Sequence, residues 1–231
     1  MMEFNLLAAL FAVMTIVIYL LTNSLYLKYR KTFLNPVLAS TAIIALILVL
    51  GNIPYDTYMM GGSWIGTLLG PAVVALAIPL YKQRDLLFNN LLPIVSGIAT
   101  GVVVGMASGI LFTQLFRFSE ELILTVLPKS LTTPVAMQVA GNLGGIPSLA
   151  AVFVMVAGFT GYIIGPALLK WLHIDSAIGR GIGLGTSAHG MGTAKAFEYG
   201  QQEASMSSVA MSLSAVFGAL LGPVAAWLLL L

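Results

Sequence analysis

The sequence predicts an all-α polytopic membrane protein with about six to eight membrane segments, some of them discontinuous half-helices. Of its 231 residues, 59% are hydrophobic and only 8% are charged, whereas soluble domains carry roughly 25% charged residues. Two polar, helix-breaking stretches, residues 127–134 and 185–195, interrupt the apolar carboxyl-terminal half. Irregular backbone is tolerated at membrane depth only where protein or a water-filled cavity surrounds it. The two stretches therefore predict broken helices around an internal site, as in inverted-repeat carriers.

The composition also argues against several classes of function. The net charge of +2 and the lack of a basic run argue against a nucleic-acid partner. The chain has no cysteine, which excludes disulfides, thiolate metal sites and cysteine nucleophiles. Its two histidines, His173 and His189, are far apart, so we expect neither a metal site nor a bound cofactor. The aspartates all fall in predicted loops and there is no HExxH motif, so we do not expect an enzyme.

The amino-terminal half is expected to contain four membrane spans. They are residues 4–27, 33–53, 65–81 and 91–116, with a loop at residues 54–63. The first apolar run lacks the basic region of a cleavable signal, so we expect it to be retained as a span. The third span contains Pro71 and Pro79 and is expected to be kinked or discontinuous.

The positive charges predict an orientation. Lys28, Arg30 and Lys31 follow the first span, and Lys82 and Arg84 come one hairpin later. By the positive-inside rule, the amino terminus is outside and the first loop is in the cytoplasm.

Glycines four residues apart form a stripe along one face of the fourth span: Gly97, Gly101, Gly105 and Gly109. Residues at this spacing share a helix face, where another backbone can approach closely. Tight helix packing within the protomer and an interface with a second copy or a partner subunit both explain such a stripe. A shorter stripe in the span at 149–172 contains Gly158, Gly161 and Gly165.

The chain changes character near residue 118, and the segment that follows is expected to bear the site. The serine and two glutamates at 119–121 predict a helix start, and this helix reaches Pro128 after about nine residues, half a bilayer at 1.5 Å per residue. Thr133 before Pro134 predicts a second start, with an end near Val139 before a glycine-rich turn. A span at 149–172, a loop at 173–180, a second broken stretch at about 181–200 and a final span at 205–231 follow.

These breaks predict an anion site. Helix N-termini present unpaired N–H groups and the positive end of the helix dipole. If Thr133-Pro134 and Gly192-Thr193 both begin half-helices near the bilayer midplane, they form a cradle for a carboxylate, with lysines and hydroxyls as further donors. The candidate substrate-binding residues are Lys129, Ser130, Thr132, Thr133, Asn142, Ser187, His189, Thr193 and Lys195, with Asn35 as an additional polar lining residue.

Each candidate also has a purely structural interpretation. Lys129 could extend to a membrane interface, and Lys195 could neutralise Glu198 three residues later. The hydroxyls could hydrogen-bond to carbonyl groups of their own helices. His189, followed by a glycine, could make a structural hydrogen bond or couple transport to protons, because histidine titrates near neutral pH. Glu198 is the second candidate for proton coupling.

At these same stretches the sequence resembles the LrgB/CidB/YohK family. The matching segments are residues 127–136, 144–147 and 185–194, together with 71–81 and 35–36. The resemblance covers nearly the whole chain. It implies one LrgB-like domain over residues 1–231, with scaffold spans at about 1–118 and a broken-helix half at about 119–231. It also implies a place in the bacterial cytoplasmic membrane.

The resemblance implies two competing functions. Some members are described as antiholin-like regulators of murein hydrolase activity and cell lysis, acting with a small LrgA/CidA-type membrane partner. Others are described as carriers of small monocarboxylates, namely pyruvate in bacteria and glycolate with glycerate in a plastid relative. A holin-like lesion needs self-associating spans and no midplane cradle, so the polar breaks favour a carrier of the pyruvate, lactate or glycolate type. Lysis control is the alternative, and a homodimer or larger homo-oligomer is expected.

Overall fold

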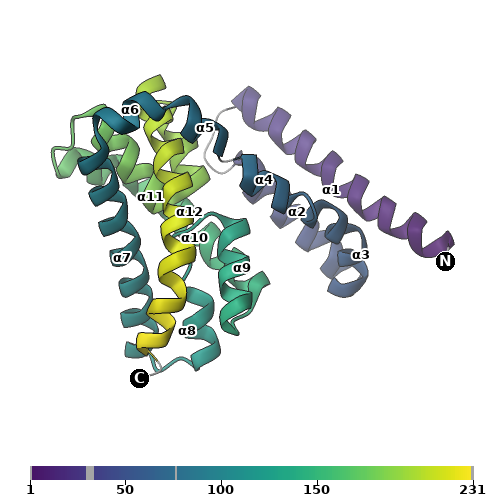
Figure 1. Ribbon diagram of the computed structural model, residues 1–231. Helices are drawn as coiled ribbons and strands as arrows, with labels where there is room; N and C mark the ends of the chain where they lie inside the picture. Colours follow the sequence, from purple (N-terminus) through teal and green to yellow (C-terminus); the bar gives the residue numbers. More distant parts are fainter. Residues whose placement is uncertain (1, 30–33, 76, 230–231) are drawn as a thin grey trace. The chain divides into compact units, whose positions relative to one another are not determined.

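The computed structural model describes residues 2–29, 34–75 and 77–229, and the secondary structure of these residues is helical (Figure 1). This confirms the predicted all-α class. In chain order the helices are α1 (Met2–Tyr29), α2 (Pro36–Leu50), α3 (Tyr55–Gly66), α4 (Leu69–Ala75), α5 (Ala77–Lys82), α6 (Arg84–Asn89), α7 (Leu91–Leu115), α8 (Glu120–Val126), α9 (Thr133–Leu143), α10 (Pro147–Trp171), α11 (Ala177–Ala196) and α12 (Gln201–Leu229).

Four helices among the described residues are long and apolar enough to cross a membrane. They comprise Leu6–Tyr29, Leu91–Leu115, Pro147–Trp171 and Gln201–Leu228, close to four of the predicted spans. By length and composition, they make this a multi-pass membrane protein. α2 is also apolar but has 15 residues, fewer than the roughly 20 of a straight span. Arg30 and Lys31, which contribute to the predicted orientation, lie outside the described residues.

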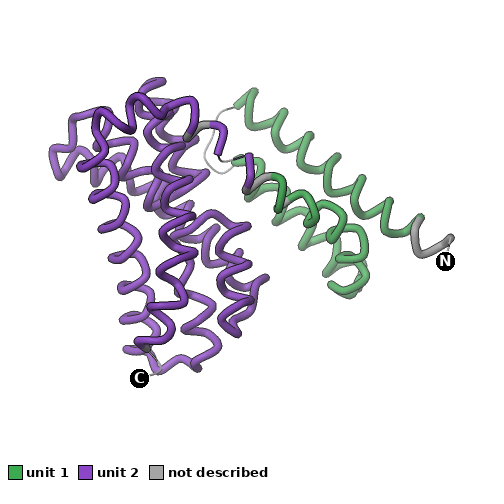
Figure 2. The backbone as a smooth tube through the Cα atoms, viewed as in Figure 1, with its two compact units in different colours: residues 1–72 green, residues 73–231 purple. Residues whose placement is uncertain are grey.

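The chain divides into two compact units, residues 1–72 and residues 73–231 (Figure 2). This boundary differs from the functional division near residue 118, because α7 packs against α11 and α12 within the larger unit. The division into a scaffold half and a site-bearing half stays a prediction.

In the smaller unit, α1 contacts both α2 and α3. Gly61 allows α3 to approach α1, because a Cβ atom there would overlap the main chain at Ala8. The prediction of a loop at residues 54–63 is wrong, since α3 occupies most of it. Pro54 stands at the N-cap, and Asp56 gives the first turn a negative charge that the helix dipole favours. Asn35 also has a structural role, because its Oδ1 accepts a hydrogen bond from the Val37 N–H at 3.0 Å and caps α2.

The core of the larger unit lies between its long helices. α7 buries one face with a spacing of four residues, as expected of a helix with a single apolar stripe. That face consists of Ile94, Ile98, Val102 and Met106. Leu127 and Leu131, from the short segment between α8 and α9, are also fully buried and belong to the same core. The two ends of this segment are therefore buried, while Lys129 and Ser130 between them are half-buried.

The glycine stripe of α7 is occupied within the chain. A Cβ atom at Gly101 would lie 2.5 Å from Cγ2 of Thr186, and one at Gly105 would lie 2.8 Å from Oγ of Ser130. A Cβ atom at Gly97 would make an ordinary 3.4 Å contact with Ile182 of α11, and one at Gly109 would make ordinary contacts with Val126 and Lys129. The stripe therefore faces other segments of the same chain. The first two glycines face α11, and the last two face the end of α8 and the residues that follow it.

Candidate functional site

The first break consists of residues 127–132, between the seven-residue helix α8 and the eleven-residue helix α9. α9 begins at Thr133, so the N-cap is Thr132 and Pro134 is the second helical residue, one position away from the prediction. The helix continues past Val139 to Leu143, because the left-handed Gly144 at φ 91° ends it.

The two helices around the first break lie beside each other. The main-chain N–H of Ile146, after α9, donates a hydrogen bond to Oγ1 of Thr125, in α8, at 2.8 Å. Gly145 permits this approach, since a Cβ atom there would lie 2.8 Å from the Thr125 nitrogen. The chain therefore runs along α8, reverses its direction at the first break and runs back along α9.

The second break is His189, whose backbone angles of φ 42° and ψ −122° interrupt α11. Non-glycine residues seldom adopt a positive φ, so the surrounding structure must hold this conformation. Beyond His189 the chain folds back on itself. A Cβ atom at Gly192 would overlap the carbonyl oxygen of Leu184, although residues eight apart in a straight helix are about 12 Å apart. In agreement, the Arg180 guanidinium lies 5.4 Å from the centre of the Tyr199 ring.

The predicted helix start at Gly192-Thr193 is therefore wrong. Both residues lie inside the returning part of α11, and the interruption falls at His189. Gly192 has a different role. It lets the part of α11 after His189, the returning part, approach the backbone of the part before His189, the entering part. The predicted loop at 173–180 is also shorter than expected, since α11 begins at Ala177 after the N-cap Ser176.

The two breaks meet in the larger unit. The His189 imidazole interacts with the main chain of Lys129. It also lies against α10, where a Cβ atom at Gly158 would be 3.1 Å from its Cε1 atom. Gly161, one turn along α10, receives Ala188 in the same way. The second glycine stripe is thus the surface of α10 against which α11 packs where it folds back.

Lys129 connects the first break to α7. Its Nζ donates hydrogen bonds to the Gly105 carbonyl oxygen at 2.8 Å and to the Ser108 hydroxyl at 3.2 Å. Lys129 is therefore held inside the protomer. Ser130, next to it, packs against Gly105.

Other predicted residues have partners within the protein. Ser187 is exposed and donates to the Gly183 carbonyl at 2.6 Å, the local hydrogen bond that we considered as its alternative. The Thr193 hydroxyl donates to the His189 carbonyl at 3.0 Å and lies 2.9 Å from the hydroxyl of Ser207. Asn142 is exposed in the last turn of α9, and Thr133 is half-buried in its first turn.

Lys195 and Glu198 form a separate cluster. Nζ of Lys195 lies 2.6 Å from Oε2 of Glu198, so the pairing proposed as their structural role is present. The buried Tyr162 donates to Oε1 of Glu198 at 3.2 Å, and Lys195 lies 5.0 Å from the centre of the Tyr162 ring. The structure thus brings Lys129, Ser130 and His189 to the meeting of the breaks and keeps Lys195 with its own carboxylate. The functional roles of all these residues stay predictions.

Several buried polar atoms near the breaks have no hydrogen-bond partner among the described residues. They are Oγ1 of Thr132, Oγ1 of Thr186, Nε2 of His189 and Oγ of Ser214. Buried polar groups are nearly always paired, so each such atom calls for a physical explanation. We predicted Thr132 and His189 as site residues but not the other two. Thr186 stands within the polar stretch 185–195 and could have been found there, whereas Ser214 is one of five serines in the final span, and nothing in the sequence separates it from the other four.

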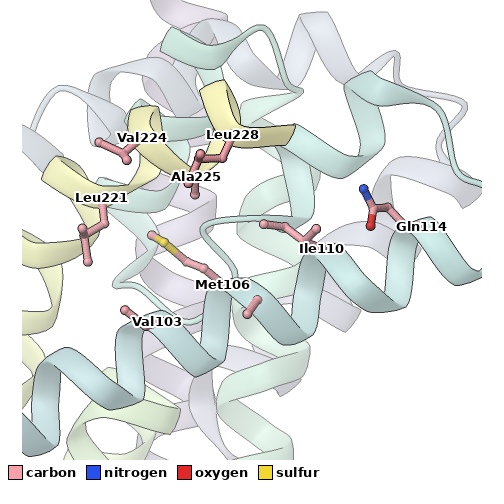
Figure 3. A pocket seen from close by; sticks show the side chains of 9 residues that line it. Val103, Met106, Ile110, Gln114, Leu221, Val224, Ala225 and Leu228 are labelled. Carbon is pink, nitrogen blue, oxygen red and sulfur yellow. The ribbon is translucent and has the colours of Figure 1, made fainter. Parts of the chain in front are cut away.

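Two hollows in the larger unit are lined by residues outside the two breaks. An apolar groove of about 470 Å³ lies between parts of α7 and α12, with Val103 and Met106 on one side, Leu221 and Val224 on the other, and Gln114 towards one end (Figure 3). A second hollow, of about 460 Å³, lies where α10 ends and α11 begins, beside Lys170 and Arg180. Among the described residues, no three acidic or histidine side chains gather in a way that could hold a metal ion.

Comparison with known proteins relates the whole chain to one family. The model of the LrgB-like family matches residues 15–228. A Bacillus subtilis protein named YxaC is 49% identical over 221 residues, which cover 96% of each chain. The holin-like protein CidB of Staphylococcus aureus is 37% identical over 217 residues, or 94% of this chain and 95% of the relative. CidB of Staphylococcus epidermidis is 38% identical over the same shares. No solved structure matches the chain.

Proposed function

The chain belongs to the LrgB-like family, and from this premise we propose that it acts in the bacterial cytoplasmic membrane as an antiholin-like regulator of murein hydrolase activity and cell lysis. The observation that supports this proposal is the similarity to holin-like CidB proteins over 94% of the chain. The regulator would work with a small LrgA/CidA-type membrane protein, as a homodimer or larger assembly.

A membrane partner would bind the lipid-facing helix surfaces and not the glycine stripe of α7. Gly101 and Gly105 already contact Thr186 and Ser130, so a change there would disturb the fold before it disturbed a complex. The exposed apolar side chains of α1, such as Leu6 and Leu10, remain available to lipid or to a partner.

Co-expression with an LrgA/CidA-type partner tests this proposal. Murein hydrolase activity in cell extracts and the rate of lysis would be measured for cells that contain the chain, the partner, both or neither. We expect the chain to change both quantities only when the partner is present. Equal hydrolase activity and equal lysis in all four strains would contradict a regulatory role.

A second candidate function, carriage of small monocarboxylates, is favoured by the meeting of the two breaks. We propose that α8 with α9, and the folded α11, enter the membrane from opposite sides as discontinuous segments. Polar, irregular backbone at membrane depth is a usual feature of carrier sites. Here Lys129 and His189 come together beside the first residues of α9, whose N-terminal N–H groups favour a carboxylate.

In this hypothesis the carboxylate binds between the breaks and alternates between the two membrane faces. Lys129 supplies positive charge, and Thr132 and His189 supply hydrogen-bonding atoms that have no partner in the described part of the chain. His189 and Glu198 are the candidates for proton coupling. Because Glu198 is paired with Lys195 and Tyr162, its protonation would first have to break that cluster.

Uptake into proteoliposomes tests carriage directly. The purified protein would be reconstituted and given labelled pyruvate, lactate or glycolate, with and without an inward proton gradient and with and without the partner. Saturable uptake that falls in Lys129→Met but not in Lys170→Met would support a carrier. Folded protein that shows no uptake of the three acids, even with its partner, would contradict carriage and leave the regulatory proposal standing.

A further inference from the structure

Ser214 of α12 is a buried serine whose hydroxyl has no partner among the described residues. Its side chain is 2% exposed. The neighbouring serines of the same helix behave differently, because Ser208 and Ser212 donate to the carbonyl groups four residues earlier, at 2.9 and 2.8 Å. This local bond is the usual way for a serine in a membrane helix to satisfy its hydroxyl. Ser214 does not make it, although its helix offers a carbonyl group at Ala210.

The position of Ser214 along α12 places it between the two breaks. Ala210, one turn before it, contacts the entering part of α11, where a Cβ atom at Gly185 would lie 2.9 Å from the Ala210 Cβ. Gly218, one turn after it, receives the side chain of Leu131 from the first break. Residues four apart share a helix face. Ser214 therefore faces the region that α11 approaches from one end and the first break from the other.

Thr186 approaches the same region from α11. It follows Gly185, which contacts Ala210, and its Cγ2 methyl group packs against Gly101 of α7. The side chain is 5% exposed, and its hydroxyl lacks a partner among the described residues. The methyl group thus has a packing role, whereas the hydroxyl bonds to no atom of the residues that the structure describes.

We propose that the hydroxyls of Ser214 and Thr186 bind the oxygen atoms of a small carboxylate held between the two breaks. This inference rests on the second proposed function, carriage of monocarboxylates. A hydroxyl can donate one hydrogen bond, and a carboxylate accepts several. α12 then contributes to the site together with the two breaks, and the binding energy of the ligand offsets the burial of hydroxyls that have no other partner among the described residues.

The proposal predicts opposite effects on stability and on binding. In Ser214→Ala, the ligand-free protein should unfold at a higher temperature, because a buried hydroxyl without a partner has been removed. The affinity for the ligand should fall about tenfold, since a hydrogen bond to a charged group is lost. Ser212→Ala is the matched control. Its hydroxyl is also buried but already bonded, so this variant should not gain stability and should keep its affinity.

The experiment measures thermal unfolding of the purified, detergent-solubilised protein during titration with pyruvate, L-lactate and glycolate. A ligand that binds the folded state raises the midpoint of unfolding, and at a given concentration a tighter ligand raises it further. Thr186→Val, which keeps the methyl contact with Gly101 and removes the hydroxyl, gives an independent second variant. Weaker stabilisation of both variants, with Ser212→Ala unchanged, would support the inference.

Failure of this inference and failure of the carriage proposal give different results. If the wild-type protein binds an acid and both variants bind it equally well, the assignment of Ser214 and Thr186 is wrong while carriage stands. If no acid stabilises the wild-type protein and none is taken up by proteoliposomes, the carriage proposal fails, and this inference fails with it.

Discussion

Nζ of Lys129 donates a hydrogen bond to the carbonyl oxygen of Gly105 at 2.8 Å, across 24 positions of the chain. The acceptors of this ammonium group are a carbonyl and the hydroxyl of Ser108, both neutral. Within the described part of the chain, no carboxylate lies within ion-pair distance of it. A charge at membrane depth with only neutral partners favours the binding of an anion.

Replacement of Lys129 by methionine should lower monocarboxylate uptake at least about tenfold, since a hydrogen-bonded charge next to the ligand is lost. The initial rate of uptake into proteoliposomes is the measurement. Lys170→Met is the control, because Lys170 is exposed in the last turn of α10. An unchanged rate in Lys129→Met would remove Lys129 from the site and leave it a structural connection to α7.

Gly101→Ala should destabilise the protein by about 1–3 kcal/mol, because the new methyl group would overlap Thr186. Thr186→Ser removes the Cγ2 atom that lies nearest, so the double variant should recover part of that loss. Denaturant or thermal unfolding in detergent measures both changes. Gly66→Ala is a suitable control, since nothing lies within 4 Å of a Cβ atom there. Additive effects in the double variant would contradict the contact between the two residues.

Gly192→Ala tests the fold-back of α11. The added methyl group would meet the carbonyl oxygen of Leu184, and backbone can yield less easily than a flexible side chain. We expect a loss of about 3 kcal/mol or more, the upper part of the range for overpacking. Gly183→Ala is the matched control, because its Cβ atom would make an ordinary 3.6 Å contact with Leu169. Equal stability of the two variants would mean that α11 continues straight past His189.

The sequence predicted the helical class and four long spans, because apolar length is a local property that composition reveals. It also located both polar stretches that contain the breaks. It did not predict that His189 is the interruption of α11, since glycines surround this residue and a glycine seemed the natural place for a turn. The glycines at 185 and 192 instead allow close approach between segments, which depends on contacts distant in sequence.

Ser214 is a second residue that could not be identified from the sequence, because its surroundings depend on contacts distant in the chain. Its span contains five serines, and no motif or spacing separates Ser214 from the other four. That its hydroxyl has no partner among the described residues becomes visible only when α11 and the first break are placed on either side of it. The loop expected at 54–63 failed for a different reason. Its tyrosines, glycines and Asp56 are typical of loops, but contacts with α1 hold them in a helix.

The pair Lys195–Glu198 should contribute little to stability. The Glu198 side chain is 52% exposed, and exposed ion pairs contribute about 0.2–1 kcal/mol. A double-mutant cycle with Lys195→Met and Glu198→Gln, measured by unfolding at low and high salt, should give a coupling energy in this range that weakens with salt.

If Glu198 couples transport to protons, Glu198→Gln should also abolish the effect of a proton gradient on uptake. A gradient effect of normal size in that variant would remove Glu198 from the candidates.

The natural absence of cysteine allows a direct test of whether the two breaks are approached from opposite membrane faces. Glu120 begins α8 just after the end of α7, and His173 precedes α11, whose residues Ile182 and Thr186 contact the first half of α7. If α7 crosses the membrane, these two exposed positions lie on opposite sides. Lys170 and Arg180 make the α11 side the more basic one, so the positive-inside rule assigns it to the cytoplasm. In intact cells, a membrane-impermeant maleimide should label Glu120→Cys at once and His173→Cys only after permeabilisation. The parent chain is the control, because it has no cysteine to label. Labelling of both variants from the outside would mean that α8 and α11 enter from the same face, which is incompatible with a site that opens alternately to the two sides.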